Sequence, residues 1–364
     1  MSNQVSEKFE GVNGDFGKRA EALLRGACER VGFESAGEIW RGLIYDRDRV
    51  GTVIVRGVYQ GKPAVLKMQG VRPQIEEADL IVGFNRENQS KRIRVPEVYY
   101  AEPWGGAWHY GLTIMEDVTA PALYTPPFAD DAVRAAFADF YTEFCEHTVG
   151  EPFVPREDRE KDTATFLRTR LAVWKKINAT ADPKRRLHDA AQAQLVSGFE
   201  ACIDRYAVDV PMVFTHGHLG PNDIRVEAPG KYVLFSNFFW GWRPLWYDLV
   251  FNVWCNLMAL WKEDPLRFST AEILVNEWFA TCEALHPARS DNDFEKHFQF
   301  MLLERCVGSC LVDLVVADRG AEAETRRVAQ LEVMRVLARV LIAELTASPR
   351  RHTTEAPDRT LDAL

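Results

Sequence analysis

The stretch THGHLGPNDI, residues 215–224, gathers chemically capable side chains between two apolar runs near the middle of the 364-residue chain. It holds two histidines, two glycines, a proline, an asparagine and an aspartate. Glycine and proline favour a tight, constrained turn over a flexible linker. An imidazole, with a reference pKa of about 6.5, can act as a base near neutral pH, so His218 is a candidate for proton transfer.

A lysine and a glutamate form a second candidate pair nearer the N-terminus. Lys67 lies inside the apolar run AVLKM, where an ammonium group is costly to place unless it meets an anion. Alternatively, the strand lies at a sheet edge and the lysine faces water. The helix predicted next begins QIEEAD, and Glu77 is our preferred partner over Glu76 and Glu87. Acidic residues are also favourable at a helix N-terminus without any such pairing.

Two further segments carry groups that suit ligand recognition. LTIMEDV, residues 112–118, is an apolar strand that runs into an acidic stretch where the strand-rich part of the chain gives way to helices. A backbone exposed at such a junction can hydrogen-bond the edge of a purine, although a simple connection between domains has the same pattern. SNFFWGWRPLWYDL, residues 236–249, follows the histidine loop and supplies Ser236, Asn237 and Asp248. The order of these features is more specific than any one of them.

In this order the four features resemble the aminoglycoside phosphotransferase and choline-kinase type of protein-kinase-like fold. That family reads VLK on its third strand, an EDV-like hinge, HGDLxPxN in its catalytic loop, an Asp-Trp/Phe-Glu metal segment and then a stretch that ends in Asp-Leu. This chain reads VLKM, MEDV, HGHLGPND, SNFF and GWRPLWYDL in the same order. The resemblance covers roughly residues 38–262.

The resemblance implies an α+β, protein-kinase-like fold of two lobes, with a small antiparallel sheet in the N-lobe and a larger, mainly helical C-lobe. It also implies ATP and Mg²⁺ as cofactors and the hydroxyl of a small molecule as acceptor. Lys67, paired with Glu77, would then hold the ATP phosphates. The backbone of the hinge would face the adenine at Met115, Glu116 and Val118.

Two more positions match the family and one segment departs from it. His216 and Asp248 correspond to residues that shape and brace the catalytic loop. The turn YDRDRVG, residues 45–51, should cover the phosphates, but it holds one glycine and two aspartates. Such a turn is poorly suited to a close approach of its backbone to an anion.

Three positions of the implied catalytic site also depart from the family pattern. His218 replaces the aspartate that serves as base, and Asp223 replaces the asparagine that binds metal. Ser236 replaces the aspartate that opens the metal segment, and a shift of one residue would put Asn237 there instead. All three replacements fall on groups that phosphoryl transfer needs for its base and its magnesium ion.

Two interpretations of these replacements follow. In the first, the chain is a rewired small-molecule phosphotransferase in which His218 orients or deprotonates the acceptor hydroxyl. Asp223 then keeps one carboxylate in the magnesium shell, and Lys67 holds the phosphates. In the second, the chain is a pseudokinase, a catalytically inactive binding or scaffold module that functions with or without nucleotide.

The acceptor side of the site would be walled by the predicted helices 129–206 and 268–317. Acidic side chains on these helices would favour a cationic substrate, although an ordinary solvated helix surface has the same composition. They are Glu143, Glu146, Asp189, Glu277 and Glu283.

Periodicity supplies the elements that position these residues. Residues 1–35 form a predicted N-terminal helical extension, because apolar positions recur at helical spacing. Short runs rich in β-branched and aromatic residues predict an antiparallel N-lobe over 36–118. Residues 119–347 are predicted to form a helical C-lobe with a catalytic-loop hairpin at 211–240, and the aperiodic tail 348–364 is predicted to be disordered.

Composition limits the classes of function. The net charge of −9 argues against nucleic acid and anionic membrane surfaces as partners, because both require basic patches. The longest apolar stretch, 249–261, is too short to span a bilayer. The seven cysteines are scattered without CxxC pairs, which is typical of reduced thiols, so we expect a cytoplasmic protein.

Overall fold

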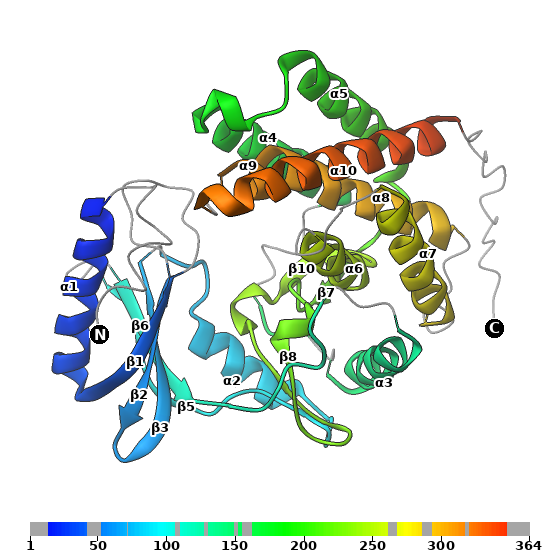
Figure 1. Cartoon of the computed structure of the whole chain (residues 1–364). Coiled ribbons are helices and arrows are strands. Elements are labelled where there is room, and N and C mark those ends of the chain that lie inside the picture. The colour runs from blue at the N-terminus through cyan, green and yellow to red at the C-terminus, as the bar shows by residue number, and fades with distance from the viewer. Residues whose placement is uncertain are drawn as a thin grey trace, which may run out of the picture.

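The computed structural model describes most of the chain, which folds into two groups of elements (Figure 1). The described residues are 14–41, 52–70, 72–105, 110–126, 130–148, 152–154, 162–260, 268–285, 293–316 and 320–347. The turn 45–51 and the tail 348–364, for which the sequence predicts a poor phosphate-covering loop and disorder, lie outside them. Figure 1 shows the sheet and α1 on one side and the longer helices on the other.

A five-stranded antiparallel sheet forms the N-terminal lobe, in the order β1-β2-β3-β6-β5. The short runs of β-branched and aromatic residues that predict an antiparallel N-lobe include its first three strands. The strands are β1 (Phe33–Arg41), β2 (Thr52–Tyr59), β3 (Lys62–Gln69), β5 (Val98–Gly105) and β6 (Tyr110–Glu116).

Helix α1 (Gly14–Val31) packs against this sheet. Leu24 and Ala27 of the helix join the same buried cluster as Val55 and Leu66 of the strands. Buried and less buried positions alternate along β2 and β3, because successive side chains of a strand point to opposite faces. The helix that the sequence sets apart as an extension therefore shares the core of the N-lobe.

Lys67 lies on the central strand of the sheet. It pairs with Ile54 of β2 on one side and with Thr113 of β6 on the other. The alternative in which Lys67 belongs to an edge strand and faces water is therefore wrong. A central position leaves its ammonium group dependent on a partner within the protein or on a ligand.

Between β3 and β5 the chain forms α2 (Glu77–Glu87) and the short strand β4 (Ile93–Arg94). β4 pairs in parallel with β9 (Lys231–Leu234), which in turn pairs with the antiparallel strand β8 (Ile224–Ala228). The sequence does not predict β4, because two residues are too few to show a period. Its pairing joins the segment between β3 and β5 to the strands that follow the histidine loop.

The C-terminal lobe is mainly helical, and the histidine loop lies between β7 (Met212–Thr215) and β8. β7 pairs with β10 (Gly241–Pro244), a strand that the sequence does not predict. None of the described helices is both long and apolar enough to cross a membrane. The longer helices are α3 (Asp131–His147), α4 (Thr163–Thr180), α5 (Asp189–Tyr206), α6 (Tyr247–Ala259), α7 (Phe268–Leu285), α8 (Phe294–Gly308) and α10 (Gly320–Ala347).

Trp240 packs at the centre of an aromatic cluster that joins the two lobes. Its ring lies 5.6 Å from Phe84 of α2, 5.8 Å from Phe144 of α3 and 5.6 Å from Phe214 of β7. All four side chains are buried in one core. Because this core includes residues that flank the histidine loop, it fixes the position of the loop relative to α2.

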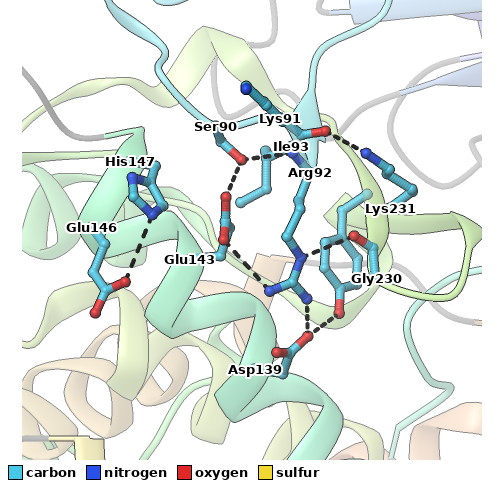
Figure 2. Close-up of polar contacts among 11 residues, drawn as sticks. Ser90, Lys91, Arg92, Ile93, Asp139, Glu143, Glu146, His147, Gly230 and Lys231 are labelled. Carbon is cyan, nitrogen blue, oxygen red and sulfur yellow. Dashed lines mark hydrogen bonds and ion pairs between the residues drawn. The ribbon is translucent and has the colours of Figure 1, made fainter.

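A polar network anchors the loop after α2 to the C-lobe (Figure 2). Arg92 donates from Nε to the carbonyl of Gly230 at 3.0 Å, and it forms ion pairs with Asp139 and Glu143 of α3. The hydroxyl of Ser90 also donates to Glu143. Glu143, an acidic residue considered for cation binding, is therefore committed to this network.

Candidate active site

Lys67 meets a carboxylate of α2 at the start of the candidate site. Its Nζ lies 2.6 Å from Glu77 Oε2, and the two side chains are only 16% and 8% exposed. The two alternative glutamates make other contacts. Glu76 accepts a hydrogen bond from the backbone N–H of Trp104 at 2.9 Å, and Glu87 forms an ion pair with Arg86. The structure therefore places Glu77 against Lys67 and positions the ammonium group.

Asp248 braces the histidine loop from the start of α6. Its Oδ1 accepts the N–H of Gly217 at 2.8 Å, and its Oδ2 accepts the hydroxyl of Thr215. Gly217 has a φ of 76°, and a Cβ there would lie 2.8 Å from the carbonyl oxygen of Phe239. Only glycine suits such a position, which explains the sharp turn of the loop.

His216 is completely buried and supports the loop from within. Its Nε2 lies 2.8 Å from the carbonyl of Phe235 and must donate the bond, because a carbonyl only accepts. Among the described residues, its Nδ1 atom has no hydrogen-bond partner. Burial lowers the pKa of His216, and the attraction of Asp248 and Asp223 only partly opposes this effect. The imidazole is therefore neutral in the folded protein.

We expect the neutrality of His216 to make the protein less stable in mild acid. Below a pH of about 6.5 the unfolded chain takes up a proton that the folded chain does not, so the free energy of unfolding falls by about 1 kcal/mol between pH 7.5 and 5.5. His216→Gln keeps a donor for Phe235 but cannot titrate. Urea unfolding at both pH values should show a stability difference between the two proteins that narrows in acid. An unchanged difference would contradict the prediction.

Asp223 lies at the centre of a hydrogen-bonded cluster in the loop. Its Oδ2 lies 3.0 Å from His218 Nδ1 and accepts the N–H of Gly220 at 3.2 Å. Its Oδ1 accepts the hydroxyl of Ser236. Ser236 has a φ of 58°, in the left-handed region that is uncommon for residues other than glycine. The three positions that depart from the family pattern are therefore in direct contact.

Asp223 determines which ring nitrogen of His218 carries a proton. Burial raises the pKa of Asp223, but the bond and charge of His218 and the bond from Ser236 outweigh it and hold the pKa below its usual value. An ionised carboxylate only accepts hydrogen bonds, so His218 Nδ1 is the donor, and in the neutral form of the imidazole Nε2 is then the nitrogen with the lone pair. A carboxylate-oriented imidazole of this kind is chemically suited to act as a general base.

Aromatic rings connect His218 to Lys67 across the two lobes. The imidazole stacks on Phe239, with centroids 4.2 Å apart and an interplanar angle of 13°, and contacts Phe251 at 4.3 Å. Phe238 packs edge-on against Phe239 at 5.5 Å, and its ring centroid also lies 5.5 Å from Lys67 Nζ. A chain of ring contacts through Phe238 and Phe239 therefore links the lysine to the imidazole and the Asp223 cluster.

The residues of the cluster do not fit a magnesium site as they stand. Both oxygens of Asp223 accept hydrogen bonds, and Ser236 donates its hydroxyl to one of them. Asn237, the alternative ligand, is buried and uses its amide on the Leu234 carbonyl at 2.9 Å and on Trp240 Nε1 at 3.1 Å, so it supports the loop instead. Over the described residues, no group of three or more His, Cys, Asp and Glu side chains could hold a metal ion.

The hinge segment ends β6 at the boundary of the lobes. Met115 is buried and Val118 is half-buried, so the backbone between them lies close to the surface of the junction. The N–H of Glu116 donates to the carbonyl of Glu97, the residue before β5, at 2.9 Å. The structure thus places the hinge residues beside the sheet that carries Lys67.

Arg94 ties this hinge to the strand after the histidine loop. It forms a bidentate pair with Glu116 at 2.6 and 2.8 Å, and its Nε lies 2.9 Å from Glu227 of β8. The bond from Arg94 lowers the pKa of Glu116, so the carboxylate stays ionised. The contacts of Arg94 with Glu116 and Glu227 therefore connect the hinge, β4 and β8.

Sequence reasoning missed the aromatic residues around His218 and the role of Arg94. A signal for Phe251 does exist, because Asp248, Phe251 and Cys255 recur at helical spacing on α6. That face meets the loop: a Cβ at Gly220 would lie 3.1 Å from Cys255 Sγ and 3.4 Å from Phe251. Arg94 has no comparable signal, since both its partners are distant in sequence.

No protein-family model and no curated protein matches the sequence. Solved structures match it along most of its length. The apo form of a thermostable mutant of the aminoglycoside phosphotransferase APH(4)-Ia is 11% identical, with a TM-score of 0.55 over 90% of this chain and 100% of that chain. Spectinomycin phosphotransferase APH(9)-Ia, in complex with ADP and spectinomycin, is 13% identical, with a TM-score of 0.50 over 87% of this chain and 94% of that chain.

The amicoumacin kinase hAmiN, in complex with AMP-PNP, Ca²⁺ and Ami, is 12% identical, with a TM-score of 0.50 over 87% of this chain and 93% of that chain. The chain therefore has the protein-kinase-like fold of aminoglycoside phosphotransferases and related small-molecule kinases. Identities this low establish the fold alone, because one fold hosts several functions.

Proposed function

We propose that this chain binds ATP between its lobes and transfers a phosphoryl group to a hydroxyl of a small molecule, with His218 as the base. The observation that carries the proposal is the 3.0 Å contact between His218 Nδ1 and Asp223 Oδ2. It leaves the lone pair of Nε2 for an acceptor, and 35% of the imidazole side chain is exposed. The likeness in fold to kinases solved with ADP and AMP-PNP supports nucleotide binding.

In the proposed reaction the acceptor oxygen attacks the γ-phosphorus of ATP. A P–O bond forms to the acceptor, the bond from the γ-phosphorus to the β–γ bridging oxygen breaks, and ADP leaves. His218 Nε2 takes the hydroxyl proton, and Asp223 stabilises the imidazolium that results. Lys67, held by Glu77 at 2.6 Å, offsets negative charge on the phosphates.

A second candidate function is favoured by the state of Asp223. Its two oxygens already accept three hydrogen bonds from the protein, so the carboxylate is committed to the loop. A loop stabilised in this way suits a pseudokinase that retains a nucleotide at Lys67 without transferring its phosphate. Both candidate functions require the chain to bind a nucleotide, and only the phosphotransferase releases its phosphate.

Calorimetry and phosphate release together test the proposal. We expect ATP to bind the wild-type protein with or without Mg²⁺, and phosphate to be released slowly with water as acceptor. Asp223→Asn should keep ATP binding but lower release by about 10²-fold or more, because the imidazole loses its orientation. ATP binding without release would favour the pseudokinase. Absence of ATP binding would contradict both candidate functions.

Arg94→Gln is expected to weaken ATP binding roughly fivefold, or by about 1 kcal/mol, and to leave the binding of inorganic triphosphate unchanged. The reason is that the variant frees Glu116 at the hinge, where we propose adenine contacts, and leaves Lys67 intact. Calorimetry with both ligands checks this. Arg86→Gln is the matched control, since its pair with Glu87 is exposed. Equal weakening of both ligands would show that Arg94 acts through general stability.

A further inference from the structure

A strip of partly exposed side chains extends from His218 toward α4. Phe239, which stacks on the imidazole, is 36% exposed, and its carbonyl accepts a bond of 3.0 Å from Arg243 Nη2. The guanidinium of Arg243 lies 5.8 Å from the ring of Phe166, and that of Arg170 lies 5.4 Å from the same ring. We call these five residues the aromatic–arginine strip.

Two guanidinium groups of the strip, those of Arg170 and Arg243, contact the same two aromatic rings. Besides Phe166, both lie over the buried ring of Tyr247, Arg170 at 5.7 Å and Arg243 at 6.0 Å. Only the Nε atom of Arg170 donates a hydrogen bond to a carboxylate, that of the buried Glu304, at 2.8 Å. Its two Nη groups have no hydrogen-bond partner among the described residues. A guanidinium group with two unpartnered Nη groups, beside a second one, has the chemistry that recognises an oxyanion.

The carboxylates beside His218 are not available to a cation. Asp223 accepts bonds on both oxygens, and so does Asp248. Two of the acidic residues considered for cation binding are also committed, because Glu143 pairs with Arg92 and Glu277 pairs with Arg134. The surface next to the base therefore presents aromatic rings and guanidinium groups and no open carboxylate from this set.

We propose that the acceptor is an aromatic hydroxyl compound that carries an oxyanion, a carboxylate or a phosphate, and is not a polycation. The proposal rests on the proposed function, of which it names the substrate class. The ring of the acceptor packs against the exposed part of Phe239 beside the imidazole, and its hydroxyl lies at Nε2 of His218. Its oxyanion accepts the Nη donors of Arg170, which is the specificity-determining residue.

A matched set of phenols differing in charge tests the substrate class. 4-Hydroxyphenylacetate carries a carboxylate, 4-hydroxybenzylphosphonate a phosphonate, tyrosol is neutral and tyramine is cationic. In calorimetry without nucleotide, we expect one or both of the anionic phenols to bind at least about tenfold more tightly than tyrosol, and tyramine to bind most weakly. The two anions distinguish carboxylate from phosphate as the preferred oxyanion. Tyramine binding at least as tightly as the anions, or absence of binding by all four, would overturn the proposal.

Single variants test whether the preference for anionic phenols depends on residues of the aromatic–arginine strip. Arg170→Gln should bring the anionic phenols to within about twofold of tyrosol, because the donors of the oxyanion are lost. Arg168→Gln is the matched control on the same helix, since its pair with Asp204 is exposed, and it should change nothing. Phe239→Leu disturbs no buried charge and should weaken the anions and tyrosol alike. An anion preference that survives Arg170→Gln would also overturn the proposal.

Failure of this inference and failure of the proposed function give different results. ATP binding and phosphate release without selective anion binding would retain the phosphotransferase and exclude this acceptor class. Anion binding that depends on Arg170 in a protein that does not bind ATP would establish the strip as a binding site and exclude the phosphotransferase.

Discussion

His218→Ala is expected to lower the rate of phosphoryl transfer by about 10²- to 10⁴-fold while leaving ATP affinity within about twofold of wild type. The variant removes the base but keeps Lys67 and Glu77, which face the phosphates in our proposal. Phosphate release from ATP under single-turnover conditions measures the rate, with water as acceptor. Calorimetry measures the affinity on the same preparation.

The control for this variant is His147→Ala, which removes a histidine that is 45% exposed on the end of α3. It should leave both quantities unchanged. Equal rates for wild type and His218→Ala would show that His218 does not act as the base. A loss of ATP affinity in His218→Ala as large as the loss of rate would show a role in binding instead.

Lys67→Met is expected to abolish measurable ATP binding, with a loss of at least about 30-fold in affinity. The variant removes the ammonium from a largely buried pair and leaves Glu77 charged and unpaired where phosphates should lie. Removing one partner of such a pair costs about 2 kcal/mol or more. ATP titration by calorimetry checks the prediction, and thermal unfolding separates it from loss of fold.

Two variants sharpen the interpretation of Lys67. Lys67→Met combined with Glu77→Gln removes the unpaired charge, so it should recover stability without recovering ATP binding. Lys62→Met on the same strand is the matched control, because Lys62 is exposed and its contact with Glu97 is 3.9 Å long. Wild-type affinity in Lys67→Met would place the phosphates elsewhere and contradict the proposed nucleotide site.

The sequence was sufficient for the fold and for part of the site. Short runs rich in β-branched and aromatic residues predict the first three strands, and the apolar run around Lys67 separates this lysine from the many on the surface. The loop at Gly217 is predictable because glycine and proline restrict the backbone in a way that local sequence reveals. The sequence alone could not rank Glu76, Glu77 and Glu87, and the structure shows the contact of Lys67 with the preferred Glu77.

Contacts between distant segments could not be read from the sequence. Ser236 reaches Asp223 only because its backbone adopts a left-handed conformation, and periodicity does not predict a single φ value. The choice between Ser236 and Asn237 depended on the same turn. The aromatic–arginine strip brings α4 beside β10, although Arg170 and Arg243 are 73 positions apart in the sequence. Only tertiary packing shows that these residues are neighbours.

The measurement that tests the central claim most directly is a double-mutant cycle between His218 and Asp223. Single-turnover phosphate release is compared in wild type, His218→Ala, Asp223→Asn and the double variant. If Asp223 acts by orienting His218, the double variant is no slower than His218→Ala alone, because residues that act as one unit are not additive. Losses that multiply in the double variant, or release that survives in His218→Ala, would contradict a catalytic pair.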